Sequence, residues 1–308
     1  MMEFKKINKA YNTVFKPNKM SIGLVIPIES YPNNPTPTMT EHLELVKLAE
    51  SLDFSAVWVR DIPFNVPSFG DVGQMYDPFV YLGYLAGATK KIALGTASII
   101  LPLRHPAHVA KAAASLDQLS DGRLILGVAS GDRPEEYPAL NISYTDRGKK
   151  FRESFEYIKQ MWIDTPIFEN EFGSLYGGID MLPKPVSNKV PMLITGASQQ
   201  NSDWLVHNGD GWMTYPRNPS SQEKIIKKWR SHSNKPVMQS LYIDLLDHDN
   251  AEAEAIHLGF KSGINYLKKY LKQLEKAGVN HIALNLRLNH AEIKATLKTI
   301  ADEVLTEF

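Results

Sequence analysis

The chain has 308 residues, of which 43% are hydrophobic, and its 34 basic and 34 acidic side chains balance to a formal charge of zero. The apolar content supports a substantial core in one large α/β domain or two small ones. The balanced charge argues against nucleic acid or an acidic membrane as the principal partner, and the lack of cysteine excludes disulfides, thiolate metal sites and cysteine nucleophiles.

The N-terminal stretch, residues 1–19, is polar and lacks the apolar core of a signal peptide. No stretch of the chain reaches the roughly 18 apolar residues that a membrane span needs. We therefore expect a cytoplasmic protein that acts on a small molecule, away from any membrane.

Short β-type runs alternate with helical patterns along the chain, as where Leu45, Leu48 and Leu52 share one helix face. Eight β-then-α units predict a (β/α)8 TIM barrel, an α/β fold, in a single domain over residues 1–308. The alternative is a doubly wound sheet, which usually has fewer strands and a glycine-rich turn after the first, whereas residues 29–37 are rich in proline and asparagine. The predicted strands are residues 22–28, 56–59, 92–96, 124–129, 192–195, 211–214, 237–245 and 282–287.

One complete unit of this alternation lies in residues 106–131. Pro106 suits a first helical turn, and Val109 and Leu116 recur at helical spacing. The Ser-Asp-Gly sequence at 120–122 ends that helix. A nearly unbroken apolar run then indicates a strand that is buried on both faces and ends in a small, polar tip.

Three long segments lie between the predicted strands and helices. Residues 164–189 carry glycine, proline and aromatic residues without a helical period, so we expect an insertion before the fifth strand that can cap the barrel mouth. Residues 65–75 and 132–146 follow strands, which places them at the C-terminal face, where barrel enzymes hold their sites. We expect these segments to determine which substrate fits.

Charged and small side chains follow the second, third and fourth strands. Arg60 and Asp61 come directly after the second strand, where they either face a ligand or form a local ion pair that holds the loop. Residues 95–98 are small, which lets a planar ligand approach the backbone, although barrel packing explains them as well. Residues 130–133 offer a hydroxyl, a glycine and a charge pair, or else a solvated loop.

The fifth strand ends in residues 195–202, a glycine turn that opens into a helix start rich in serine and asparagine. Free backbone N–H groups and the helix dipole suit such a turn to phosphate. Ordinary N-capping by Ser198 is the alternative. After the sixth strand, Tyr215 is either a stacking wall or a rim aromatic.

Metal and nucleophilic chemistry lack suitable residues. The nine histidines show no HxH or HExxH spacing, and His105 and His108 have no nearby carboxylate. There is no GxSxG motif for a serine nucleophile. A mouth with small residues and few strong acids or bases therefore predicts that an organic cofactor, and no metal, carries the chemistry.

The chain resembles the bacterial luciferase-like family of flavin-dependent oxidoreductases over about residues 21–287. The most specific stretch is residues 92–131, which is similar to the family pattern of LGT, a short apolar run with HP, and LDxLSxGRxxxGxxxG. Residues 56–61 (AVWVRD), 193–198 (LITGAS) and 210–212 (DGW) support the resemblance.

The resemblance implies a (β/α)8 barrel with an insertion that binds reduced flavin at its C-terminal mouth. Ala97 and Ser98 match a bulge that lies against the isoalloxazine ring, often through a non-proline cis peptide. The other implied cofactor residues lie beside the ring and ribityl chain (Ala129, Ser130 and Gly131), around the phosphate (Gly196, Ala197, Ser198 and Asn201) and behind the ring (Thr214 and Tyr215).

The activity implied first is that of an FMN-dependent monooxygenase supplied with reduced FMN by a separate flavin reductase. The reduced flavin would react with O₂ to a C4a-peroxyflavin, which the protein shields from water while a small organic substrate is oxidised. Arg60, Asp61 and Arg104 are the predicted catalytic contacts to substrate or peroxide.

Two positions depart from the family pattern. Members that oxidise aldehydes commonly carry histidine where this chain has Ile62 and Pro63, and a basic phosphate ligand where it has Ser130. Light emission from an aldehyde is therefore not expected. Arg133 or Arg104 is a candidate for the missing positive charge.

Three other functions stay open. An F420-dependent oxidoreductase uses the same fold but transfers hydride without O₂. A non-catalytic flavin-binding protein is compatible with the missing histidine near Ile62, and a metal-dependent barrel hydrolase is the third alternative. Family members often dimerise through helices beside the second and third strands, so the apolar residues 78–88 either form a homodimer interface or pack on their own barrel.

Overall fold

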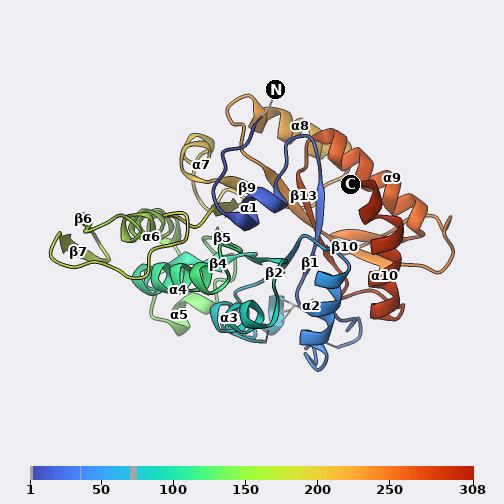
Figure 1. Ribbon diagram of the computed structural model, residues 1–308, viewed down its shortest axis with the longest axis horizontal. Helices are drawn as coiled ribbons and strands as arrows, with labels where there is room; N and C mark the ends of the chain where they lie inside the picture. The colour runs from blue at the N-terminus through green and yellow to red at the C-terminus, as the bar shows by residue number, and fades with distance from the viewer. Residues whose placement is uncertain (1–2, 35, 70–74) are drawn as a thin grey trace.

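Eight parallel strands close into a barrel in the computed structural model, which describes residues 3–34, 36–69 and 75–308 (Figure 1). Each strand pairs with the next one along the chain, and the last pairs with the first. This arrangement confirms the predicted (β/α)8 barrel. The barrel strands are β1 (Ser21–Val25), β2 (Ala56–Val59), β3 (Ala93–Thr96), β5 (Leu124–Ala129), β8 (Met192–Thr195), β9 (Gly211–Thr214), β10 (Val237–Leu245) and β13 (His281–Asn285).

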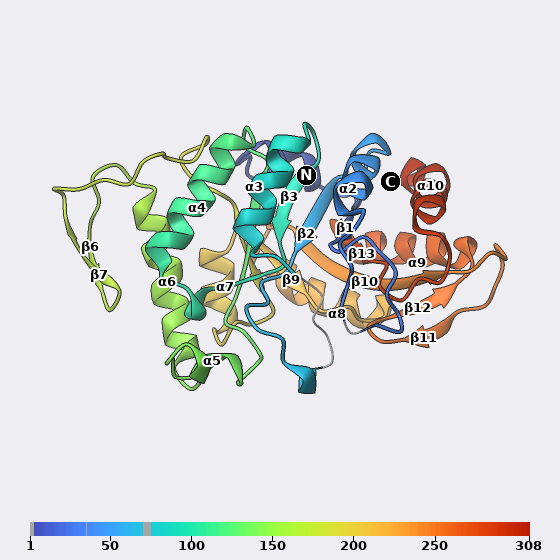
Figure 2. The same cartoon turned by 90° about the horizontal axis from the view of Figure 1, so that it is seen from below.

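Helices surround the barrel, one main helix after each strand (Figure 2). Within the described ranges, none of them combines the length and the apolar character needed to cross a membrane. Of the predicted substrate loop 65–75, residues 70–74 lie outside the described residues. The main helices are α2 (His42–Ser51), α3 (Pro78–Ala88), α4 (Pro106–Leu119), α6 (Arg147–Met161), α7 (Ser202–Asn208), α8 (Pro219–Arg230), α9 (Ile264–Ala277) and α10 (Ile293–Glu303).

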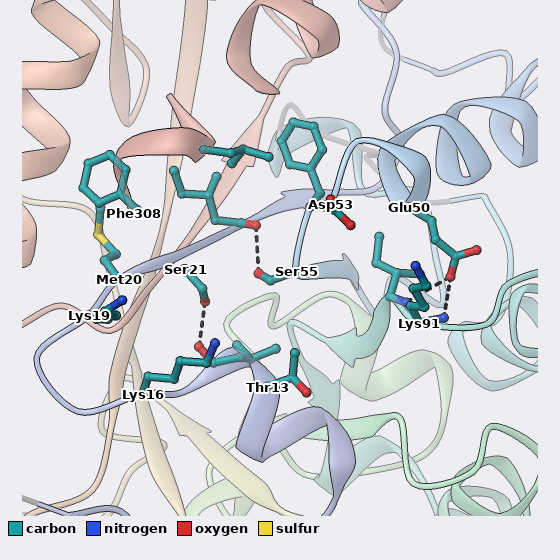
Figure 3. A pocket seen from close by; sticks show the side chains of 15 residues that line it. Thr13, Lys16, Lys19, Met20, Ser21, Glu50, Asp53, Ser55, Lys91 and Phe308 are labelled. Atoms are coloured by element: carbon teal, nitrogen blue, oxygen red, sulfur yellow. Dashed lines mark hydrogen bonds between the residues drawn. The ribbon is translucent and has the colours of Figure 1, made fainter. Parts of the chain in front are cut away.

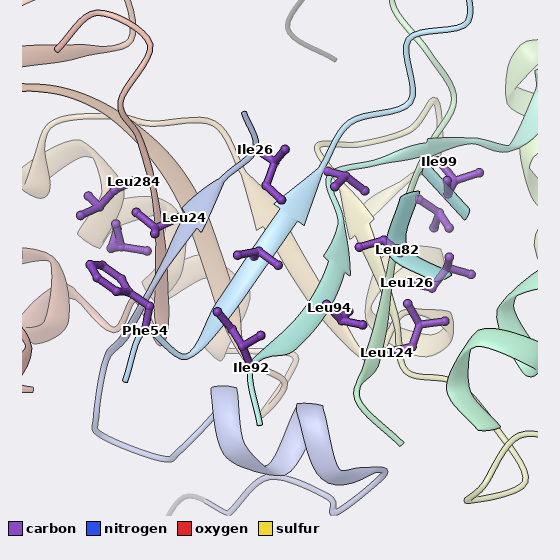
Figure 4. Close-up of a cluster of buried hydrophobic side chains, with 14 of the residues drawn as sticks. Leu24, Ile26, Phe54, Leu82, Ile92, Leu94, Ile99, Leu124, Leu126 and Leu284 are labelled. Carbon is purple, nitrogen blue, oxygen red and sulfur yellow. The ribbon is translucent and has the colours of Figure 1, made fainter. Parts of the chain in front are cut away.

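The main hydrophobic core lies between the strands and the helices (Figure 4). Leu24 of β1 and Leu126 of β5 belong to this core, whereas their chain neighbours Val25 and Ile125 belong to a separate cluster that fills the barrel interior. Both faces of each strand are therefore buried. This explains why the strands are recognisable as nearly unbroken apolar runs.

The predicted strand limits differ from the observed ones mainly at two ends. The first strand ends at Val25 and not at residue 28, and Pro27 beyond it has no N–H with which to continue a ladder. The last strand ends at Asn285, whose side chain accepts a hydrogen bond from the Arg287 N–H (3.0 Å). That bond turns the chain away from the barrel.

A short N-terminal helix, α1 (Lys9–Val14), closes the end of the barrel at which the strands begin (Figure 1). Its side chains Tyr11 and Val14 pack against the cluster in the barrel interior. Asn8 caps the helix by accepting a hydrogen bond from the Tyr11 N–H (3.0 Å), and its amide donates to the Leu124 carbonyl (2.7 Å). The sequence pattern does not reveal this helix, because six residues are too few to show helical periodicity.

A chain of hydrogen bonds runs through the barrel interior to α1. Trp58 Nε1 donates to His281 Nε2 (2.8 Å), His281 Nδ1 lies 2.7 Å from Ser21 Oγ, and the Ser21 hydroxyl donates to the Val14 carbonyl (2.6 Å). Because the indole and the hydroxyl both donate, the imidazole is neutral with its proton on Nδ1. Gly95 leaves room for the indole, since a Cβ there would lie 2.3 Å from Trp58 Cε3.

Stability is expected to fall in mild acid, and part of this fall should disappear in a His281→Gln variant. Complete burial lowers the pKa of His281 from 6.5 to about 3. Between these values the unfolded chain binds one proton more than the folded chain, so the unfolding free energy drops by up to about 1.4 kcal/mol per pH unit as the pH falls. Glutamine keeps a donor and an acceptor but does not titrate.

Urea unfolding of both proteins between pH 7 and pH 4.5 measures this difference. The unfolding free energy of the variant should depend less steeply on pH than that of the natural protein. Parallel pH profiles would contradict the assignment of a neutral, buried imidazole to His281.

The predicted insertion, residues 164–189, forms a two-stranded hairpin outside the ring of helices. β6 (Ile167–Asn170) and β7 (Gly173–Tyr176) pair antiparallel and lie beyond α6, at the edge of the molecule in both views (Figures 1 and 2). The ring of Phe168 contacts that of Tyr157 in α6, with their centres 5.9 Å apart. The hairpin packs against α6 through Phe168. It therefore does not cap the barrel mouth as expected.

Candidate functional site

A bulge after β3 brings three barrel strands together at the mouth. Ala97 and Ser98 connect β3 to the short strand β4 (Ile99–Ile100), and the peptide bond between them is cis, as the family resemblance implies. The Ser98 hydroxyl is hydrogen-bonded to Thr195 at the end of β8 and lies 3.7 Å from the sulfur of Met213 in β9. The strand tips thus form a surface of small side chains.

Asp61 at the end of β2 is bound by Arg104, which lies 43 residues further along the chain. Arg104 Nε and Nη2 donate to the two carboxylate oxygens (2.9 and 2.7 Å), and the Ile100 N–H donates to one of them as well (3.1 Å). Arg104 Nη2 also donates to Asp77 (2.7 Å). Neighbouring Arg60 is half-buried at the same strand end. Sequence adjacency therefore did not indicate the partner of Asp61.

The charges in this network stabilise one another. Burial opposes the charged form of Arg104, yet its hydrogen bonds to Asp61 and Asp77 outweigh this and raise the pKa of the guanidinium. Burial also opposes ionisation of Asp77, but bonds from Arg104 and from the N–H groups of Val80 and Phe79 lower its pKa. Asp77 is the N-cap of α3. Arg104 is therefore committed to two carboxylates and is unsuited to bind a phosphate.

The tip of β5 is held by an aromatic side chain from the following loop. The Tyr137 hydroxyl donates to the Ser130 carbonyl, and Gly131 adopts a φ of 76°. A Cβ at Gly131 would lie 2.8 Å from both Ile100 Cγ2 and the Tyr137 hydroxyl. Only glycine fits there without displacing these side chains, and Ala129 before it stays half-buried.

An ion pair that the sequence analysis missed lies in the same loop, at the start of α5 (Glu136–Ala139). Arg133 Nη1 lies 3.5 Å from Glu136 Oε1, and the Arg133 guanidinium lies 4.4 Å from the ring centre of Phe69. Burial raises the pKa of Glu136, Arg133 opposes this, and Asp61 adds to it. The loops after β2 and β5 are thus in contact across the mouth. The i, i+3 spacing of the two charges was the available signal.

The loop after β8 has an unusual backbone. Gly196, Ser198 and Gln199 have φ values of 56°, 43° and 60°. Helix α7 that follows is capped by Asn201, whose side chain accepts a hydrogen bond from the Trp204 N–H (2.8 Å). The alternative that Ser198 is the N-cap is therefore wrong, and Ser198 instead belongs to the turn itself.

Cationic side chains of α6 lie beside this loop. Gln200 Oε1 accepts from Arg152 Nε (3.0 Å) and Nη2 (2.8 Å), and Gln200 Nε2 donates to the Gly148 carbonyl (2.7 Å). The first turn of α6 carries Arg147 and Lys149 and no acidic residue. Cations at a helix N-terminus oppose the helix dipole. The acidic N-cap Asp146 and the pairing of Lys149 with Glu153 and Glu171 offset part of this charge.

The end of β9 supplies an aromatic wall. Tyr215 is 50% exposed, and a Cβ at Gly196 would lie 3.4 Å from its ring. Partial burial raises the pKa of the Tyr215 hydroxyl, and the charge of Asp132 adds to this. Arg217 Nη1 donates to the Thr214 hydroxyl (2.6 Å) and fixes the strand end. Tyr215 therefore stands between the loops after β5 and β8.

A cavity of about 340 Å³ opens at the opposite end of the barrel (Figure 3). It is lined by the side chains of Lys16, Lys91, Phe54 and Phe308, and both lysines are exposed. Because parallel barrels carry their chemistry at the C-terminal ends of the strands, we place the candidate site at the mouth. Among the described residues, no three His, Asp or Glu side chains are grouped as metal ligands.

Several known proteins are similar to this chain. The family of luciferase-like monooxygenases matches residues 20–307. An uncharacterised protein of Mycobacterium tuberculosis is 32% identical over 58% of this chain and 69% of its own length. The oxygenase component of the flavin-dependent trigonelline monooxygenase of Acinetobacter baylyi is 27% identical over 63% of this chain and 52% of its own length.

Solved structures share the barrel at lower identity. Monooxygenase RslO1 from Streptomyces bottropensis is 19% identical, with a TM-score of 0.77 over 94% of this chain and 99% of that one. An F420-dependent secondary alcohol dehydrogenase with a bound F420–acetone adduct is 20% identical, with a TM-score of 0.75 over 93% and 98%. These two likenesses show the fold alone. The match over residues 20–307 shows that the chain belongs to the luciferase-like monooxygenase family.

Proposed function

We propose that this chain is an FMN-dependent monooxygenase that oxidises a small organic substrate with O₂ and receives reduced FMN from a separate reductase. The observation that carries the proposal is the bulge at Ala97 and Ser98, set among small residues on the same barrel face as the cationic start of α6. The trigonelline enzyme, whose matching chain is an oxygenase component, supports the two-component arrangement.

The loop after β8 and the start of α6 fit the phosphate of a flavin. Positive φ values at Ser198 and Gln199 make this loop a tight turn, and turns are among the backbone conformations that form anion-binding concavities. Arg147 Nε is buried without a hydrogen-bond acceptor among the described residues, and the next residue, Gly148, is bound by Gln200. We therefore expect Arg147, whose Nη1 donates to the Tyr144 carbonyl (2.9 Å), to supply the positive charge that Ser130 does not. The residues assigned to the phosphate are Gly196, Ala197, Ser198 and Asn201.

The strand tips fit a planar ring. Small side chains let a ring approach the backbone of the bulge, and Tyr215 offers an exposed aromatic face beside them. Arg60 stays a predicted contact to the substrate, since it is half-buried at the end of β2. The residues assigned to the ring and ribityl chain are Ala97, Ser98, Ala129, Ser130, Gly131, Thr214 and Tyr215.

A bound reduced flavin supplies the redox chemistry, which here is oxygen transfer to the substrate. The residues of the chain bind and orient the reactants. The Arg133–Phe69 contact brings the loops after β2 and β5 together over the mouth, where they limit the entry of water. F420 is the alternative cofactor, because the solved F420-dependent dehydrogenase has the same barrel.

Anaerobic titration with reduced FMN, and in parallel with reduced F420, tests the proposal. The protein should bind reduced FMN, and admission of O₂ should then give an absorbance transient that free reduced FMN does not show. Preferential binding of F420 without a response to O₂ would replace oxygenation with hydride transfer. Binding of FMN without turnover of any substrate would indicate a flavin-binding protein, and binding of neither cofactor would refute the proposal.

We also propose that α3 forms a homodimer interface. Its outward residues Val80 and Tyr84 are 73% and 52% exposed, and side chains added at Gly83 or Gly87 would meet open space. A helix that is apolar on its exposed face suits contact with another protein surface. Light scattering should give twice the mass of one chain, and the mass of a single chain would contradict the proposal.

A further inference from the structure

One guanidinium joins three elements around the bulge after β3. Arg104 holds Asp61 at the end of β2 through two hydrogen bonds (2.9 and 2.7 Å) and Asp77 at the start of α3 through a third (2.7 Å). Asp61 in turn accepts from the N–H of Ile100 in β4 (3.1 Å). The network therefore links a strand end, the strand after the bulge and a helix cap.

The carboxylate of Asp61 is buried, and three hydrogen bonds occupy most of its acceptor sites. It is only 5% exposed, and both of its oxygens are engaged by Arg104, one of them by the Ile100 N–H as well. Burying a carboxylate is costly unless it is paired and hydrogen-bonded, as it is here. Burial and pairing together make Asp61 a poor contact for a reactant.

Three hydrogen bonds fix the bulge and the strand that follows it. The Ala97 N–H donates to the Val59 carbonyl (2.6 Å), the Ser98 hydroxyl bonds to Thr195, and the Ile100 N–H bonds to Asp61. Two of these three anchors lead back to the end of β2. Asp61 thus holds the chain two residues after Ser98, while the Val59 carbonyl holds Ala97 directly.

We infer that Arg104 and Asp61 are positioning residues, which set the Ala97–Ser98 backbone at the spacing that a flavin ring requires. This inference rests on the proposed function. Because the side chains of the bulge are small, its backbone would lie against the ring, so a displacement of well under 1 Å weakens binding. The earlier assignment of the two residues to substrate contact is replaced by this role.

A matched ion pair exists at the other end of the barrel. Asp210 accepts from Lys189 Nζ (2.6 Å) and from the backbone N–H of Met192 (2.9 Å) at the start of β8. As at Asp61, a carboxylate accepts hydrogen bonds from a cationic side chain and from a strand N–H. The Asp210 pair, however, lies far from the barrel mouth. Lys189→Gln is therefore the control for a loss of stability that does not affect the bulge.

The test compares Arg104→Gln, Arg104→Lys and Lys189→Gln with the natural protein. Hydrogen exchange without cofactor should become faster for the amides of residues 97–103 in Arg104→Gln, and should be unchanged there in Lys189→Gln. The dissociation constant for reduced FMN should rise about tenfold or more in Arg104→Gln. Arg104→Lys keeps the positive charge but cannot form both hydrogen bonds to Asp61. Its dissociation constant for reduced FMN should therefore lie between those of the natural protein and Arg104→Gln.

The outcomes separate the inference from the proposed function. If the natural protein binds reduced FMN and Arg104→Gln binds it equally well, the positioning role is refuted while the flavin site stands. Unchanged hydrogen exchange at residues 97–103 refutes it as well. If the natural protein binds neither FMN nor F420, the proposed function fails and the inference about a flavin ring fails with it, even where exchange shows that Arg104 orders the bulge.

Discussion

An Arg123→Met variant is expected to lose about 4 kcal/mol of unfolding free energy, which would lower the melting temperature by about 10 °C. Arg123 is 3% exposed and makes five side-chain hydrogen bonds. Its acceptors include the carbonyls of Ala86 and Thr89 at the end of α3 and of Ile92 before β3. Methionine matches the length of the arginine stem but leaves these buried carbonyls without donors.

The magnitude follows from the number of groups left unpaired. Each buried polar group that loses its partner costs about 1–3 kcal/mol, and hydrogen bonds from a charged donor are at the upper end. Burial lowers the pKa of Arg123, because removing the charged guanidinium from water is unfavourable. The hydrogen bonds of Arg123 offset this cost. Chemical denaturation measures the change. Arg123→Lys should retain part of the stability, and a loss below about 1 kcal/mol in Arg123→Met would show that water replaces the guanidinium.

A Gly127→Ala variant should lose about 3 kcal/mol and also weaken flavin binding. A Cβ at Gly127 in β5 would lie 2.0 Å from the Thr96 carbonyl oxygen and 2.7 Å from the Met213 sulfur. The carbonyl belongs to a strand and has little freedom to move. The Thr96 hydroxyl also donates to the Gly127 carbonyl (2.8 Å), so separating β3 from β5 breaks that bond too.

The loss of binding is expected because Thr96 immediately precedes the bulge at Ala97 and Ser98. Pushing the Thr96 carbonyl away shifts the backbone that would face the ring. Gly178→Ala is the control, since its added Cβ would meet no atom within 4 Å. Thermal unfolding and anaerobic titration with reduced FMN measure the two effects. Equal stability of the two alanine variants would show that β3 and β5 separate without cost.

The barrel strands were predictable because each is buried on both faces. The run from Leu124 to Ala129 agrees residue for residue with β5, since Gly122 at a φ of 72° ends the preceding turn and a small tip follows. The hairpin in residues 164–189 was not predictable from the sequence. Each of its strands has four residues, and Phe168 and Leu175 are their inward apolar positions. That is too short for a clear alternation.

The face that holds the candidate site was predictable, whereas its internal contacts were not. Strand order alone brings Ser98 and Thr195 to the same end of the barrel, and the small residues there were visible in the sequence. The partner of Asp61 depends on the path of 43 intervening residues, which no local pattern encodes.

Helix α1 closes one end of the barrel. Because Tyr11 and Val14 fill the interior at the end where the strands begin, we expect reactants to approach the strand tips from the opposite end. For an oxygenase, the share of consumed oxygen that ends in product, instead of leaving as hydrogen peroxide, is then governed by the loops after β2 and β5. Evolution can retune that yield by changing these loops while the stoppered barrel stays as it is.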